Sequence, residues 1–183
     1  GRIENFLVRM APMNEDEKWM SLAIMQAIKA ENEGEVPIGA VLVKDGLLIA
    51  KAHNQPISTN DPTAHAEIQA IRSACEMLGR PVLADSILFA SGEPCGLCYL
   101  AIRLAKISQV VILLDRNEVK QLGFDYLWTY QPQHEMTPSV KVDNLSNDVK
   151  IGPFLCCQQG GCKTNCVTAR FKYEELAASQ TQS

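Results

Sequence analysis

The chain has 183 residues, of which 46% are hydrophobic and 21% charged, and its formal net charge is −4. This length and composition fit one globular domain with its own core, and the acidic balance without a block of Lys or Arg disfavours a nucleic-acid partner. No apolar run approaches the roughly 20 residues of a membrane helix, and residues 1–12 lack the features of a signal peptide, so we expect a soluble, cytoplasmic protein with no membrane partner.

The cysteines indicate metal binding more than disulfide bonding. There are seven of them, an odd number, and no secretion signal accompanies them, which predicts reduced thiols with some serving as ligands. They are Cys75, Cys95, Cys98, Cys156, Cys157, Cys162 and Cys166.

The first elements predicted along the chain are a helix and a β-hairpin. Residues 1–12 precede Met13, and we interpret them as a cloning remnant or a natural N-terminal extension. Asn14 followed by Glu17 resembles a helix N-cap, and apolar residues then recur at helical spacing until about Gly34. The runs 38–43 and 47–50, separated by an Asp-Gly turn, predict two paired strands.

Two further helices are predicted to open at residues that can bind metal. Residues 54–63 are polar and contain two prolines, which indicates a loop, and a helical pattern follows from His65 to Leu78. Residues 86–90 predict a strand, and Pro94 stands where the next helix should begin. Cys95 and Cys98 should then lie on one face of its opening turn.

The remaining pattern predicts an α/β layered sheet. Residues 107–114 are almost continuously apolar, which is typical of a strand buried on both faces, and helices alternate with the strands. Residues 124–130 are either a fifth strand or an aromatic loop, 131–150 are polar and irregular, and 167–178 predict a C-terminal helix.

His65, Cys95 and Cys98 together supply the three protein ligands of a catalytic zinc site, which keeps its fourth position for water. A helix N-terminus also favours the anionic thiolate that binds metal. Cys95-x-x-Cys98 alone equally fits a redox pair or half of a structural zinc site. Glu67, two residues after the histidine, adds a carboxylate that can move protons at such a centre, and this combination describes hydrolytic deamination.

The pattern His65-Ala66-Glu67 followed by Pro94-Cys95-x-x-Cys98 is the signature of zinc-dependent nucleobase deaminases. The sequence from about Ile38 to Leu114 resembles the cytidine deaminase superfamily, in particular its purine branch of guanine deaminases and tRNA adenosine deaminases. The resemblance implies a three-layer α/β/α fold around a five-stranded mixed sheet and a homodimer. It also implies that His65, Cys95 and Cys98 hold zinc and that Glu67 carries protons.

The same resemblance assigns base contacts to Asn54, Ala66 and Asp125. Gly123-Phe124-Asp125 is similar to a segment of guanine deaminases, although Tyr126 replaces the second acid that usually follows there. Asp125 therefore either takes over the role of that acid or only caps a turn. Gly92, just before the cysteine motif, also departs from the commoner small-molecule enzymes and is expected to reshape the pocket wall.

The C-terminal segment 156–166 holds four thiols that the resemblance does not explain. Three interpretations stay open: a second, structural zinc site, a redox-sensitive pair, or a thiol-rich loop. The thiols belong to Cys156, Cys157, Cys162 and Cys166. We predict that this segment forms part of a single deaminase domain spanning 13–183.

These observations predict a zinc-dependent hydrolytic deaminase of a small purine, with guanine, converted to xanthine and ammonia, as the first choice. The alternatives are a tRNA adenosine deaminase, or a deaminase of guanosine, adenine, cytosine or a pterin. A non-enzyme alternative is a catalytically idle zinc-binding scaffold.

Overall fold

The computed structural model describes residues 13–158 and residue 178. The chain divides into two compact units, 1–131 and 132–183. The first unit contains the sheet and all the candidate catalytic residues. A single domain spanning 13–183 stays a prediction.

The sheet of the first unit is mixed, with the order β2-β1-β3-β4. Its strands are β1 Gly39–Lys44, β2 Leu47–His53, β3 Ser86–Gly92 and β4 Gln109–Leu114. β1 pairs antiparallel with β2 and with β3, whereas β3 and β4 are parallel. Asp45 and Gly46, both at positive φ, close the hairpin as predicted.

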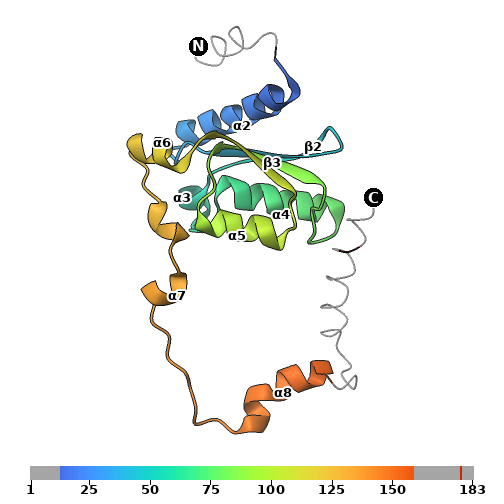
Figure 1. Ribbon diagram of the computed structural model, residues 1–183, viewed down its shortest axis with the longest axis vertical. Helices are drawn as coiled ribbons and strands as arrows, with labels where there is room; N and C mark the ends of the chain where they lie inside the picture. Colours follow the sequence, from blue (N-terminus) through green and yellow to red (C-terminus); the bar gives the residue numbers. More distant parts are fainter. Residues whose placement is uncertain (1–12, 159–177, 179–183) are drawn as a thin grey trace. The chain divides into compact units, whose positions relative to one another are not determined.

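Helices cover both faces of this sheet and give three layers, as expected (Figure 1). They are α2 Glu15–Asn32 on one face, and α4 Ala66–Leu78 and α5 Gly96–Leu104 on the other. Alternate residues of β1 serve the two faces, because Val41 packs with Met20 of α2, whereas Leu42 packs with Ala70 of α4. Asn14 caps α2 through a 2.8 Å hydrogen bond from the backbone N–H of Glu17.

The prediction that residues 107–114 are buried on both faces was wrong. β4 is an edge strand in the described part of the chain, paired with β3 alone, and its Leu113 side chain is 49% exposed. Of these residues, Ile107 and Val110 pack against the core cluster that contains Leu42, and Val111 packs against the cluster that contains Val41. An apolar run does not distinguish an edge strand from a central one, because burial depends on neighbours distant in sequence.

The expected fifth strand is also absent from the described residues, whose sheet has four strands. After α6 Arg116–Gln121, the chain turns and forms a 3-10 helix, η1 Leu127–Tyr130, in place of a strand. The hydroxyl groups of Tyr126, Thr129 and Tyr130 are engaged in hydrogen bonds with the backbone of 93–96 or with their own turn. These bonds direct the aromatic segment toward the start of α5 and away from pairing with β4.

The second unit contains α7 Gln133–Met136 and α8 Asn147–Gln158, so residues 131–150 are less irregular than predicted. The helix expected at 167–178 lies outside the described residues, apart from Ala178. No helix among the described residues has both the length and the apolar character that crossing a membrane requires.

Candidate active site

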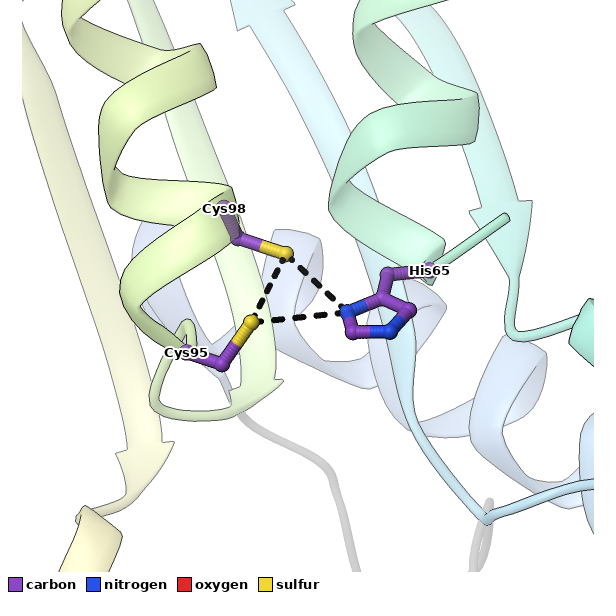
Figure 2. Close-up of side chains that lie close together, drawn as sticks. All are labelled: His65, Cys95 and Cys98. Carbon is purple, nitrogen blue, oxygen red and sulfur yellow. Dashed lines mark hydrogen bonds between the residues drawn. The ribbon is translucent and has the colours of Figure 1, made fainter. Parts of the chain in front are cut away.

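His65, Cys95 and Cys98 come together at the first turns of two helices (Figure 2). The Nδ1 atom of His65 lies 3.5 Å from Sγ of Cys95 and 3.4 Å from Sγ of Cys98, and the two sulfur atoms are 3.6 Å apart. Within the described residues these three form the one group of His, Cys, Asp or Glu side chains placed to share a metal ion. The structure thus brings together the three residues that the sequence grouped, and their role as metal ligands stays a prediction.

Local helix signals place each member of the triad. His65 is the N-cap of α4, Cys95 is the N-cap of α5, and Cys98 follows within the first turn of α5. The free N–H groups of both helix ends favour negative charge at this point. The hydrogen bond between Cys95 and Cys98 lowers the pKa of the Cys95 thiol to about 4, so Cys95 readily supplies a thiolate.

The donor set fits zinc. Zinc bonds to sulfur and imidazole nitrogen are about 2.0–2.3 Å long, so donors at the corners of a tetrahedron around it lie about 3.3–3.8 Å apart. The three donor atoms lie 3.4–3.6 Å from one another. Two thiols and one imidazole, with no fourth protein ligand in the group, match an open catalytic site more closely than a closed structural one.

Glu67 lies beside this triad and is almost fully buried, at 3% exposure. Its Oε2 atom accepts a 3.2 Å hydrogen bond from the Cys98 thiol. Burial raises the pKa of the Glu67 carboxyl, because the charged form loses its hydration. A first-turn glutamate that served only the helix dipole would lie in solvent, so the burial of Glu67 next to the triad favours a role in proton transfer.

A cavity of about 280 Å³ opens beside His65 and Cys95 of the triad. Asn54, His65, Glu67 and Cys95 lie along it, and Phe124, Asp125, Tyr126 and Trp128 form another part of its lining. The described residues that line the cavity include three carboxyl side chains, those of Glu67, Glu93 and Asp125, but no lysine or arginine. The cavity therefore suits a small, uncharged, aromatic ligand with several polar groups.

Comparison with known proteins identifies the family. The chain matches the model of the cytidine and deoxycytidylate deaminase zinc-binding region over residues 13–114. This chain belongs to that family. It is therefore a zinc-dependent aminohydrolase, and the matched range covers the triad and Glu67.

Two curated relatives represent the two purine branches of this deaminase family. Guanine deaminase of Bacillus subtilis is 41% identical over 116 residues, 63% of this chain and 74% of the relative. The tRNA-specific adenosine deaminase of Aquifex aeolicus is 42% identical over 131 residues, 65% of this chain and 87% of the relative. Sequence identity alone does not separate the two branches.

Two solved structures, one from each branch, match the chain over different lengths. The crystal structure of B. subtilis guanine deaminase has a TM-score of 0.71 at 37% identity and covers 80% of this chain and 94% of that one. A structure from work on tRNA:A34 deaminases has a TM-score of 0.53 at 45% identity and covers 54% of this chain and 76% of that one.

Asn54 and Ala66 interact with each other at the edge of the site. The Oδ1 atom of Asn54 accepts a 3.2 Å hydrogen bond from the backbone N–H of Ala66. Asn54 lines the cavity, whereas Ala66 is fully buried behind it. A direct contact of Ala66 with substrate stays a prediction.

Asp125 lines the cavity and also caps a turn, so both roles considered for it are compatible. Its Oδ1 atom accepts a 3.0 Å hydrogen bond from the backbone N–H of Leu127, and its Oδ2 atom lies 3.8 Å from Nζ of Lys120. Gly92 lies behind the same wall, where an added Cβ would come within 2.8 Å of Ile38 and 3.4 Å of Val119. Both of these neighbours line the cavity.

Sequence reasoning missed the residues that hold this wall, chiefly Glu93 and Arg116. A charged side chain directly after a buried strand and directly before Pro94-Cys95 was the available signal for Glu93. Tyr126 and Trp128, from the segment predicted as a strand or an aromatic loop, also line the cavity.

The second metal site lies largely outside the described residues. Cys156 and Cys157 fall within α8 of the second unit, while Cys162 and Cys166 are not among the described residues. A second, structural zinc ion stays a prediction.

Proposed function

We propose that this deaminase converts guanine and water to xanthine and ammonia, with His65, Cys95 and Cys98 as zinc ligands and Glu67 as the proton carrier. The observation that carries the proposal is the cavity lining, which brings His65, Cys95, Glu67, Asn54 and Asp125 around one space without a lysine or arginine among its described lining residues. A neutral base fits this lining better than a phosphate-bearing ligand does.

Base recognition follows from the polar groups of Asn54 and Asp125. The Asn54 oxygen is engaged by Ala66, which leaves the amino group of the same side chain to donate to an acceptor on the base. The Asp125 carboxylate can accept from the N–H groups that guanine presents on its pyrimidine ring. Phe124 and Trp128 provide apolar surface on which the ring can pack.

Glu67 performs the proton transfers of the reaction. Zinc, when bound, supplies a Lewis acid that makes water a competent nucleophile near neutral pH. The Glu67 carboxylate accepts a proton from the attacking water and passes protons to a ring nitrogen and to the departing amine. The water oxygen becomes the new carbonyl oxygen of xanthine, and the C2 amine leaves as ammonia, so the atoms balance.

A tRNA adenosine deaminase is the second candidate. Its support is the identity to tRNA-specific relatives, which reaches 47% over 98 residues in the protein of Agrobacterium fabrum. Such an enzyme must grip phosphates and a flipped base. The acidic net charge and the lining of the cavity make this candidate the weaker one.

The test is zinc content together with ammonia release from guanine, guanosine, adenine, adenosine, cytosine, cytidine and a pterin. One zinc per chain with turnover of guanine supports the proposal, whereas two would place a second ion at the C-terminal cysteines. Turnover of another small base, with guanine inert, overturns guanine as the substrate. If none of these compounds releases ammonia, formation of inosine in labelled tRNA supports the second candidate. If neither ammonia nor inosine is formed, the catalytically idle scaffold is the explanation that is left.

The location and assembly of the enzyme are part of the same proposal. Free thiols at Cys75, Cys95 and Cys98 support a location in the reducing cytoplasm. Three exposed leucines at helical spacing on α5, Leu97, Leu100 and Leu104, support a homodimer. Light scattering of the zinc-loaded protein tests the dimer.

A further inference from the structure

The Glu93 carboxylate accepts several hydrogen bonds, although Glu93 has no catalytic role in the proposed mechanism. It accepts hydrogen bonds from the backbone N–H of Arg116 at 2.8 Å, from its Nε at 3.1 Å and from its Nη2 at 2.8 Å. The hydroxyl group of Tyr99 donates a fourth, at 2.9 Å. The Glu93 side chain is only 11% exposed, and the Arg116 bonds lower the pKa of its carboxyl, so the pair is charged at neutral pH.

The bonds of Glu93 connect two segments that form opposite parts of the site. The first is the ligand turn, residues 93–96, which includes Cys95. The second is the wall segment, residues 116–130, which includes α6, Asp125 and η1. Arg116 begins this wall segment, so its bidentate contact fixes the start of the segment to the ligand turn.

The far end of the wall segment is attached to the same turn. The Tyr126 hydroxyl donates to the Glu93 carbonyl at 2.6 Å, and the Tyr130 hydroxyl donates to the Pro94 carbonyl. The backbone N–H of Gly96 donates to the Thr129 hydroxyl at 2.8 Å. The two ends of the wall segment also contact each other, because the Arg116 guanidinium lies over the Tyr130 ring, 3.6 Å from the ring centroid.

The wall segment is held by these contacts together with the buried Val119 and the packing of Tyr126 against the cluster of Cys95 and Cys98. It contributes no strand to the sheet, and η1 has no buried residue. Yet Val119, Phe124, Asp125, Tyr126 and Trp128 of this segment all line the cavity. A small displacement of the wall segment would therefore move the base-binding surface while the triad stayed in place.

We propose that Glu93 is a positioning residue for base binding, which acts through Arg116 to hold the wall segment against the ligand turn. This inference rests on the proposed function, because it assigns the wall segment to the base. Although Glu93 lines the cavity, the hydrogen bonds of its carboxylate go to Arg116 and Tyr99, so its effect on affinity for the base passes through the wall segment. The ligand turn itself keeps its position by another bond, from the backbone N–H of Glu93 to the Leu114 carbonyl at 2.8 Å, which substitution of the side chain preserves.

The kinetic test compares Glu93→Gln, Arg116→Met and the double variant with the unmodified enzyme on whichever base it turns over. Loss of a charged hydrogen bond predicts a KM raised about ten-fold, with kcat changed less than about three-fold. Zinc content should be unchanged. The double variant should have the same KM as the worse single variant, because both changes break one contact. A fall in kcat with constant KM, or additive effects, overturns the proposal.

Two variants separate this role from general destabilisation. Tyr99→Phe removes a bond to Glu93 from α5 and leaves Arg116 in place, so KM should change less than two-fold or so. Glu118→Ala removes the side chain that completes the capping box at the start of α6 without touching Glu93, and it should lower stability while KM is kept. A ten-fold rise in KM in Glu118→Ala would show that any loss of stability in α6 suffices, and the proposal would fail.

A second measurement does not depend on the substrate. In a Trp19→Phe background, Trp128 of the wall segment is the single tryptophan. Its quenching by acrylamide should rise on Glu93→Gln as the wall segment loosens, whether or not guanine is the substrate. Unchanged quenching overturns the positioning role. If quenching increases but the enzyme is inert toward guanine, the positioning role holds and only guanine as the substrate is rejected.

Discussion

The Oδ1 atom of Asn54 accepts a 3.2 Å hydrogen bond from the backbone N–H of Ala66, the first residue of α4. Ala66 lies between the metal-ligand candidate His65 and the proposed proton carrier Glu67. The loop after β2 is thus tied directly to the turn that carries both of them. Asn54 can therefore act on the base and on the local structure at once.

Replacing Asn54 with alanine should weaken both folding and base binding. The change leaves a buried N–H of Ala66 without its partner, which costs about 1–3 kcal/mol in the free energy of unfolding. The lost contact to the base should raise KM about ten-fold. Urea unfolding of the zinc-loaded protein and steady-state kinetics measure the two effects.

Asn14→Ala is the matched control for this change, because it removes an equivalent amide-to-backbone bond at the start of α2. It should cost about 0.5–2 kcal/mol of stability and leave KM unchanged. Equal KM values in the two variants would contradict a base contact by Asn54.

Glu67→Gln should abolish turnover while zinc content is kept. The amide has the size of the carboxyl but cannot carry the protons, so kcat should fall by at least about 10²-fold. Glu17→Gln, at an exposed first-turn glutamate of α2, tests the alternative helix-dipole role and should leave kcat unchanged. A Glu67→Gln enzyme with normal kcat would refute the mechanism. Ammonia release and metal analysis on the same samples provide both readings.

The candidate metal centre could be predicted from the sequence because local signals fix it. His65 and Cys95 are helix N-caps, and Cys98 lies one turn beyond Cys95. Helix starts and spacing within one turn are both visible in a single sequence. The alternation of helices with strands predicted the layers for the same reason.

The wall of the cavity could not be predicted because it depends on pairs distant in sequence. Glu93 and Arg116 are 23 residues apart, and Pro94 and Tyr130 are 36 apart. Aromatic residues are common both in cores and in pockets, so composition did not separate these roles. The exposure of β4 could not be predicted for the same reason, because it depends on whether a second strand pairs with β4 in the sheet.

Removing zinc should lower the melting temperature of the protein. A metal that binds only the folded chain stabilises it by mass action, so chelation withdraws that stabilisation and added zinc restores it. Cys98→Ala should lose zinc and no longer respond to chelator. Cys75→Ala is the control, since Cys75 packs against the core cluster of α4 and should keep both zinc and the chelator response. Loss of zinc in Cys75→Ala, or its retention in Cys98→Ala, would be inconsistent with the assigned ligands.

The Glu93–Arg116 ion pair should give stability that disappears in acid. Hydrogen bonds from Arg116 lower the pKa of the folded Glu93 carboxyl below its unfolded value of roughly 4.3. The stabilisation is therefore complete above roughly pH 4.3 and is lost as the pH falls through the lower, folded pKa.

Urea unfolding of metal-free protein at a series of pH values measures this effect without interference from ligand protonation. The advantage of the unmodified chain over Glu93→Gln should be constant from roughly pH 7 to 5 and should shrink below roughly pH 4. In an Arg116→Met background the pH-dependent part of the advantage should be much reduced. A difference between the two chains that grows toward acid would have the wrong sign for this pair.

Gly96→Ala should displace η1 from the ligand turn without removing a ligand. A Cβ built on Gly96 would lie 1.9 Å from the Thr129 carbonyl oxygen and 2.6 Å from its carbon, so the backbone of the wall segment must move. Gly152→Ala in α8 is the control, because a Cβ there meets nothing within 4 Å and a helical glycine replaced by alanine stabilises by about 0.5–1 kcal/mol. We expect Gly96→Ala to raise KM at least about ten-fold and to increase Trp128 quenching in the Trp19→Phe background, with zinc retained. Normal KM in Gly96→Ala would mean that base binding tolerates movement of the wall segment, and the role assigned to Glu93 would then lose its structural basis.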